Sequence, residues 1–358
     1  MLDYGGAERL ASSLSLGFAA QGHSVHLVSL RDGGLPPIPK ERLRQAGVAL
    51  ETLSKPDGFS LPALTALARY AKRNRIDVIH THNPLVNHYG AAAARMAGVP
   101  AVVNTLHGPG TLSMPGWART LFWTSCLITD RIVSVCDAVN EAVRKLYPLP
   151  PSKHAVIYNG IELDTLVGIR PHPANGEFVF GTMARLVPVK DHETMVEAFA
   201  LVHQRLPRCR LEILGDGELR SDLERTVREK GLNQAVLFKG TSSDPAPFLA
   251  GLDAFVMSSR SEGLPLSLLE AMAAGLPVVV TAVGAMPEIV EKARCGWVCP
   301  PRQPKALADS MLAAMQAEDR LERGGRARAS AVENHSAAKM TSSYLDLFEG
   351  LLPAEKRQ

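Results

Sequence analysis

Cysteine is scarce and irregularly placed in this chain, with residues at positions 126, 136, 209, 295 and 299. None of them forms a Cys-x-x-Cys pair, and an odd, scattered set argues against a disulfide framework. A reducing cytoplasm fits this usage best. The sequence also lacks a signal peptide and any apolar run of about 18 residues, so we expect no helix that spans a bilayer.

Charge of one sign is not in excess either. The 358 residues include 39 basic and 36 acidic side chains, which gives a net charge of +3. This balance gives no strong argument for a nucleic-acid partner, and it is compatible with anionic substrates or membrane surfaces. A chain of this length is long for a single core, so we expect two domains.

Short apolar segments alternate with helical ones along both halves of the chain. The segments predicted as strands are 24–30, 48–53, 76–80, 101–106, 132–135, 178–184, 209–214, 236–238, 253–257, 277–281 and 296–298. This alternation predicts an α/β protein with parallel sheets that carry helices on both faces. Residues 167–177 are rich in Gly and Pro and form the best candidate for a linker between the halves.

The segment 260–280, R-S-E-G-L-P-L-S-L-L-E-A-M-A-A-G-L-P-V-V-V, is the most informative part of the chain. Gly263 and Pro265 interrupt the backbone after Glu262, and a short helix is predicted to follow. The free N–H groups and the dipole of a helix start form a natural seat for an anion. Glu270, about a turn and a half into the helix, can reach a neutral hydroxyl group beside it. This pattern fits a nucleotide-sugar, whereas two glutamates without such surroundings would be solvated surface groups.

This segment resembles the donor-site motif of the family 4 retaining glycosyltransferases, which have the GT-B architecture. The resemblance covers nearly the whole chain and is strongest from Gly181 to Pro300. It implies two Rossmann-like domains that face a central cleft, with the C-terminal helix crossing back to the N-terminal domain. It places an acceptor domain at 1–167, completed by 335–358, and a nucleotide-sugar donor domain at 168–334.

The same resemblance implies roles for individual side chains. Arg185 and Lys190 are expected to hold the donor's diphosphate, Glu262 the sugar hydroxyls, and Glu270 the ribose. His107, at a strand end in the first half, is expected to face the transferred sugar, with a hydrogen-bonded loop histidine as the alternative. The expected catalytic residues are His107, Arg185, Lys190 and Glu262. The expected donor-binding residues are Gly5, Gly6, Arg185, Lys190, Gly240, Glu262, Gly263, Leu264, Pro265, Leu266 and Glu270.

Metal binding has two weak candidates in the sequence. His80 and His82 project to the same side of a predicted strand, but no third ligand lies at a suitable spacing, so a polar strand end is favoured. Asp216 and Glu218 resemble an Asp-x-Asp pair, but their neighbours fit the start of a helix better. We therefore expect no metal ion and no cofactor besides the nucleoside-diphosphate sugar, which is a co-substrate.

Two segments of the first half are unusual. The Gly5-Gly6 turn opens a helix without the strand that normally precedes such a turn, so we expect that the first strand of the N-terminal sheet is missing from this sequence. Residues 111–128 include the aromatic side chains Trp117 and Trp123. A core helix is favoured there, and contact with a membrane interface or a lipid-linked acceptor is the alternative.

Together these observations predict a retaining glycosyltransferase of the hexosyltransferase type, acting in polysaccharide biosynthesis. It would move a sugar from a nucleoside-diphosphate sugar to a glycan or lipid-linked acceptor. One alternative is a nucleotide-sugar epimerase of the same architecture, which would need positioned acid–base residues. Another is a catalytically silent sugar-nucleotide-binding subunit. We expect no nucleic-acid partner, a cytoplasmic location that includes the inner face of the membrane, and peripheral membrane contact through the N-terminal domain.

Overall fold

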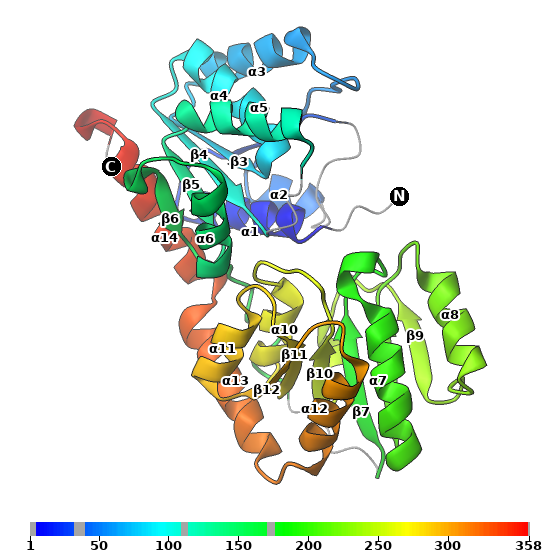
Figure 1. The fold of residues 1–358 in the computed structure, drawn as a ribbon. Coiled ribbons are helices and arrows are strands. Elements are labelled where there is room, and N and C mark those ends of the chain that lie inside the picture. The colour runs from blue at the N-terminus through cyan, green and yellow to red at the C-terminus, as the bar shows by residue number, and fades with distance from the viewer. Residues whose placement is uncertain (1–4, 32–39, 109–113, 170–175, 357–358) are drawn as a thin grey trace. The chain divides into compact units, whose positions relative to one another are not determined.

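The structure is a computed structural model that describes residues 5–31, 40–108, 114–169 and 176–356. Its elements form two compact units, one made of Met1–Gly160 with Ala337–Gln358 and the other of Ile161–Ser336 (Figure 1). Both units are built from parallel strands joined by helices, so the predicted α/β class is confirmed.

The boundary between the units differs from the predicted one. Residues 161–167 and 335–336, which we assigned to the first domain, belong to the second unit. Ile161 bridges Ser336 and its N–H donates to the carbonyl of His335, so the first and last residues of the second unit pair with each other. Most of the expected linker falls outside the described residues.

The first unit contains two parallel sheets. The larger has the order β3 (Val78–His82), β4 (Ala101–Leu106), β5 (Arg131–Ser134) and β6 (His154–Val156). The smaller pairs β1 (His26–Ser29) with β2 (Ala49–Thr52). Every residue of β4 is buried, whereas β1 and β3 are mostly half-buried. Among the described strands, none pairs with the second edge of β1 or of β3.

The helices that cover these sheets come from both the N-terminal part and the C-terminal end of the chain. They are α1 (Gly6–Ala20), α2 (Lys40–Gln45), α3 (Leu61–Arg73), α4 (Pro84–Ala97), α5 (Gly116–Leu127), α6 (Asp137–Leu146) and α14 (Ala337–Leu351). Helix α14 packs against α1, where the rings of Phe18 and Phe348 lie 5.5 Å apart. The last helix of the chain therefore completes the core of the first unit.

The second unit holds one six-stranded parallel sheet in the order β12-β11-β10-β7-β8-β9. Its strands are β7 (Phe178–Met183), β8 (Cys209–Leu214), β9 (Val236–Gly240), β10 (Ala254–Met257), β11 (Val278–Thr281) and β12 (Gly296–Cys299). Every residue of β7, β10 and β11 is buried, because helices cover both faces of the sheet.

The helices of this unit form two layers. They are α7 (His192–Arg205), α8 (Arg220–Glu229), α9 (Ala246–Ala250), α10 (Leu266–Ala273), α11 (Met286–Ala293), α12 (Pro304–Gln316) and α13 (Arg320–Asn334). Helix α7 packs against α8 and α12, while α13 packs against α10 and α11 (Figure 1). No described helix of either unit combines the length and apolar composition needed to cross a membrane.

Candidate functional site

The centre of the second sheet is a topological switch point. The strand β7 comes first in the chain but lies in the middle, with β8 on one side and β10 on the other. In open α/β sheets, ligands bind where neighbouring strands lead into helices on opposite faces, outside the carboxyl ends of those strands. The loops that follow β7 and β10 therefore define the candidate site.

Hydrogen bonds hold these two loops together. The hydroxyl of Ser258, just after β10, donates to the carbonyls of Lys190 and Asp191 at 3.0 and 2.9 Å. The backbone N–H of Arg260 donates to the carbonyl of Val189 at 2.8 Å. The backbone around Lys190 is thus fixed against the loop that carries Glu262.

An ion pair joins two of the predicted site residues across this junction. The Nζ atom of Lys190 lies 2.5 Å from Oε1 of Glu262, and the same oxygen accepts a hydrogen bond from the Ser259 hydroxyl at 2.7 Å. The side chains of Lys190 and Glu262 are 19% and 10% exposed, so both charges can still be reached from solvent. Lysine carries three N–H donors, and Glu262 engages one of them.

A second ion pair, between Arg260 and Asp191, was not predicted from the sequence. The Asp191 carboxylate accepts from the Arg260 guanidinium at 2.6 Å and from the Thr194 hydroxyl at 2.9 Å. Burial raises the pKa of Asp191, but the hydrogen bonds from Arg260 and Thr194 outweigh it, so that the pKa is lowered overall. Asp191 also has a φ of 53°, a backbone conformation that costs a non-glycine residue energy. The only sequence signal was a carboxylate directly after Lys190.

The turn from Glu262 to Pro265 enters α10 as predicted, with the helix beginning at Leu266. Residues Gly263, Leu264 and Pro265 are buried, and Glu270 is 3% exposed within α10. The carbonyl of Gly263 accepts from the N–H of Ala285 at 2.9 Å. The loop after β11 therefore contacts this turn and holds it in place. No sequence pattern indicated this contact.

The remaining loops at this sheet edge are joined to the β7 loop. The N–H of Leu186 donates to the carbonyl of Asp216 at 2.9 Å, and the N–H of Gly215 donates to the carbonyl of Gly240 at 2.6 Å. Arg185, next to Leu186, is exposed and forms no ion pair with a described residue. Gly240, the last residue of β9, has a φ of 71°.

The other predicted site residues belong to the first unit. Gly5 caps the N-terminus of α1, which begins at Gly6. His107 follows β4, and its Nε2 atom lies 3.0 Å from Nδ1 of His82, while Nε2 of His80 lies 2.8 Å from the Thr105 hydroxyl. The two histidines considered as a metal pair thus have hydrogen-bond partners at the ends of β3 and β4.

The three rings of this histidine cluster are held neutral. Burial lowers the pKa of His80, His82 and His107, in the case of His82 to about 4. His82 and His107 therefore share one proton in their hydrogen bond, so one ring nitrogen donates and the other accepts. Across the described part of the chain, no three His, Cys, Asp or Glu side chains are grouped so that they could hold a metal ion.

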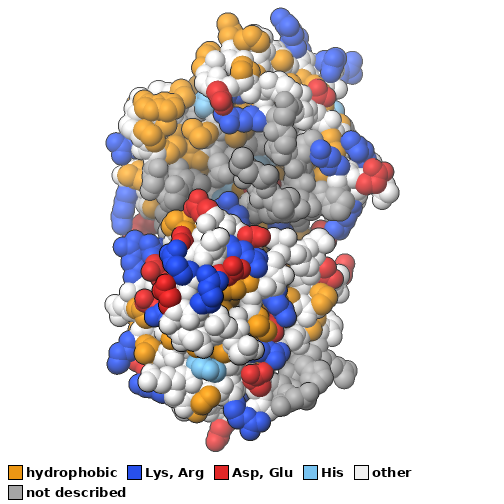
Figure 2. All heavy atoms as spheres, turned by 90° about the vertical axis from the view of Figure 1, so that its right-hand side faces the viewer, with side chains coloured by type: hydrophobic (Ala, Val, Ile, Leu, Met, Phe, Trp, Pro, Cys, Tyr) orange, Lys and Arg blue, Asp and Glu red, His pale blue; other side chains and the backbone are white. Residues whose placement is uncertain are grey.

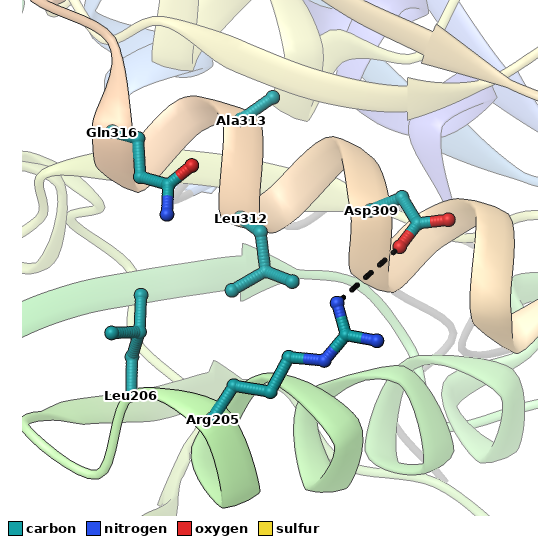
Figure 3. A pocket seen from close by; sticks show the side chains of 6 residues that line it. All are labelled: Arg205, Leu206, Asp309, Leu312, Ala313 and Gln316. Carbon is teal, nitrogen blue, oxygen red and sulfur yellow. Dashed lines mark ion pairs between the residues drawn. The ribbon is translucent and has the colours of Figure 1, made fainter.

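A separate hollow of about 330 Å³ lies in the second unit, between the end of α7 and α12 (Figure 3). Arg205 points across it toward Asp309, with 3.9 Å between the charged atoms. Because α7 starts at the carboxyl edge of the sheet and ends at Arg205, this hollow lies at the opposite edge from Lys190. It is therefore distinct from the switch-point site.

Taken together, the two parallel α/β units define a protein of the two-domain Rossmann type, with Lys190 and Glu262 at the switch point of the second sheet. Comparison with family models makes the assignment specific. Residues 4–165 match the model described as Glycosyltransferase Family 4, and residues 169–330 match Glycosyl transferases group 1. The chain belongs to the family 4, group 1 glycosyltransferases, as the sequence resemblance predicted.

Individual relatives agree with this assignment. The chain is 30% identical over 248 residues to UDP-Gal:alpha-D-GlcNAc-diphosphoundecaprenol alpha-1,3-galactosyltransferase of Escherichia coli, a match that spans 62% of each chain. It is 25% identical to N-acetyl-alpha-D-glucosaminyl L-malate synthase of Bacillus anthracis, over 98% of this chain and 96% of that protein. These relatives give no support to the epimerase alternative.

Solved structures show the same fold. The structure of Anabaena Alr3699/HepE in complex with UDP has a TM-score of 0.82 and 20% identity, covering 97% of this chain and 96% of that one. Sucrose-phosphate synthase from Thermosynechococcus elongatus has a TM-score of 0.80 and 20% identity, covering 97% and 94%. The predicted GT-B fold class is confirmed by these neighbours.

Proposed function

We propose that this protein is a retaining glycosyltransferase that moves a sugar from a UDP-sugar to a glycan or lipid-linked acceptor. The observation that carries the proposal is the meeting of Lys190 and Glu262 at the switch point of the second sheet. The name of the Escherichia coli relative describes a UDP-Gal donor and a diphosphoundecaprenol acceptor, and Anabaena HepE was crystallised with UDP and with UDP-glucose. These names support uracil as the donor's base and a lipid-linked molecule as one acceptor class.

The reaction would depend on charge stabilisation at this site. Departure of UDP from the sugar develops negative charge on the β-phosphate, and Lys190, Arg185 and the N–H groups after Glu262 would oppose it. One preorganised donor of this kind contributes about 3–4 kcal/mol to lowering a barrier. Glu262 would hold sugar hydroxyls and Glu270 the ribose. The acceptor would attack from the face that UDP leaves, so the anomeric configuration is retained.

The first unit would supply the acceptor side of the reaction. His107, held by His82 at the end of β4, would lie near the transferred sugar. We further propose that the enzyme needs no metal ion and no cofactor, that it works in the cytoplasm at the inner face of the membrane, and that its first unit makes the peripheral contact there. The roles of Gly5 and Gly6 in donor binding are part of the same proposal.

The test is release of UDP from a panel of UDP-sugars by the purified chain, with NMR assignment of the anomer formed. Lys190→Ala should mainly reduce turnover, whereas Glu270→Ala should weaken UDP binding. Lys305→Ala is the matched control, because Lys305 is exposed on α12 and its ion pair is with Asp309, outside the Lys190–Glu262 junction. If Lys190→Ala and Glu270→Ala both leave donor consumption at the level of the control, the site assignment is wrong. A silent binding subunit would bind UDP and release none from any donor.

A further inference from the structure

The exposed side of α5 carries four large apolar side chains, with the exposed Thr120 and Thr124 between them. Trp117 is 70% exposed, Leu121 and Trp123 are each 37% exposed, and Leu127 is 51% exposed. Only the opposite face is packed into the unit, where Phe122 is 1% exposed. Our preference for a core helix is therefore wrong for the face that carries both tryptophans, and residues 111–113 of that segment lie outside the described residues.

The neighbouring helix extends this apolar surface. On α4, Leu85 and Met96 are 58% and 56% exposed. The two helices are joined by a buried polar contact, in which the side-chain amide of Asn87 donates to the hydroxyls of Ser125 and Thr129 at 2.8 and 3.1 Å. We call the exposed residues Leu85, Met96, Trp117, Leu121, Trp123 and Leu127 the α4–α5 face. Figure 2 shows, on one side of the molecule, hydrophobic side chains gathered over this unit.

The charged side chains that α4 and α5 themselves carry are all basic. Residues 78–129 contain no Asp or Glu. Arg119 is exposed on α5 and forms no ion pair with a described residue. At the end of α5, the guanidinium of Arg95 donates to the carbonyl of Ile128 at 3.0 Å, and the ammonium of Lys153 donates to the carbonyl of Leu127 at 2.8 Å. Asp130, paired with Arg95, is the nearest carboxylate along the chain. Arg95 is thus paired with Asp130 and Lys153 binds backbone carbonyls, while Arg119 is a cation of this face without an ion pair among the described residues.

We propose that the α4–α5 face docks on an anionic lipid bilayer, with Trp117 and Trp123 at the level of the headgroups. An exposed helix face that combines aromatic and aliphatic side chains with nearby cations is suited to lie in the membrane interface. Tryptophan favours that depth because its ring is apolar and its N–H is polar. Anionic headgroups would meet cations and no carboxylate on these two helices. The inference rests on the peripheral contact proposed above for the first unit and names its residues, and vesicle binding and UDP release can fail independently.

The main test is flotation of the full chain with vesicles of phosphatidylcholine, with and without phosphatidylglycerol. The wild type should float with the anionic vesicles. The variant Trp117→Gln/Leu121→Gln should partition at least about tenfold less, because full burial of one such side chain stabilises by about 1.5–3 kcal/mol and about 1.4 kcal/mol is tenfold. Leu321→Gln is the matched control, since Leu321 is 74% exposed on α13 of the second unit. It should partition like the wild type.

A second readout locates the contact. Vesicles with brominated acyl chains should quench the tryptophan fluorescence of the wild type but not that of Trp117→Phe/Trp123→Phe, in which Trp297 is the remaining tryptophan. Arg119→Gln should reduce the preference for anionic over neutral vesicles. The proposal is overturned if the wild type floats with neither vesicle, or if Leu321→Gln loses as much binding as the double variant. It is also overturned if the wild type self-associates without lipid and Trp117→Gln/Leu121→Gln is monomeric, because the face would then bind a second copy of the chain.

Discussion

The contact between the loop after β11 and the turn that follows Glu262 can be tested by adding a single methyl group at Gly284. Gly284 lies in the loop after β11 with a φ of 59°, and a Cβ atom placed there would lie 2.4 Å from the carbonyl oxygens of both Glu262 and Gly263. Gly231, between α8 and β9, has a similar φ of 68°, and a Cβ atom there would meet nothing within 4 Å. Gly231→Ala is therefore a matched control for Gly284→Ala, with the same backbone cost and no collision.

The expected effects follow from these distances. Both substitutions force alanine into the left-handed region, which costs about 1–2 kcal/mol. In Gly284→Ala, the turn that follows Glu262 must also move by about 1 Å to restore ordinary contact, and overpacking of this kind typically costs about 1–3 kcal/mol. We expect the free energy of unfolding to fall by roughly 2–5 kcal/mol in Gly284→Ala and by roughly 1–2 kcal/mol in Gly231→Ala.

The two variants should also differ in function, because only one moves the site. Urea unfolding followed by circular dichroism measures stability, and calorimetric titration measures UDP affinity. Gly284→Ala should weaken UDP binding and slow UDP release from the donor, since it displaces Glu262 and the N–H groups beside it. Gly231→Ala should bind UDP like the wild type. Equal losses of stability and equal UDP affinity in the two variants would refute this account of the turn.

Three further outcomes are expected. Burial lowers the pKa of His192 from 6.5 to about 4, so between these values only the unfolded state binds its proton. His192 alone should therefore lower the free energy of unfolding by about 1.4 kcal/mol per pH unit on acidification, and His192→Leu should reduce the measured slope by about that amount in urea unfolding at pH 4–7. Arg260→Ala should lower the free energy of unfolding by about 1–2 kcal/mol at pH 7. Arg260 holds the pKa of Asp191 below 3.8, so the difference in unfolding free energy between variant and wild type should shrink as the pH falls below that pKa. His82→Phe removes the hydrogen bond to His107 and should lower kcat by about tenfold with the KM for the donor nearly unchanged, a split that steady-state kinetics measures.

Much of the second unit was predictable because its signals are local. Gly263 and Pro265 interrupt the chain in any context, so the start of α10 at Leu266 was predicted correctly. A helix was also predicted over 319–331, although Gly324 and Gly325 weaken the pattern, and α13 runs unbroken from Arg320 to Asn334. A Cβ atom at Gly324 would lie 2.1 Å from the carbonyl oxygen of Gly275, so glycine permits α13 to approach the end of α10 closely.

For the aromatic segment of α5, the sequence predicted the helix but not which of its sides is exposed. Its spacing predicted a helix, and α5 is present from Gly116 to Leu127. Apolar residues occur on all sides of that helix, so the sequence could not indicate which side is covered. Packing against the sheet buries Phe122 and leaves Trp117 exposed. Exposure depends on neighbours that are distant in sequence.

By itself the sequence determined the alternation of strands and helices, the helix start after Glu262 and the family, because backbone propensities and motif residues act over short stretches of chain. The tertiary structure alone decided which distant groups meet. Lys190 and Glu262 form an ion pair, and His82 hydrogen-bonds His107, because parallel strands bring their carboxyl ends to one edge of a sheet. Strand order is fixed by the packing of whole helices and sheets, and no short segment contains that information.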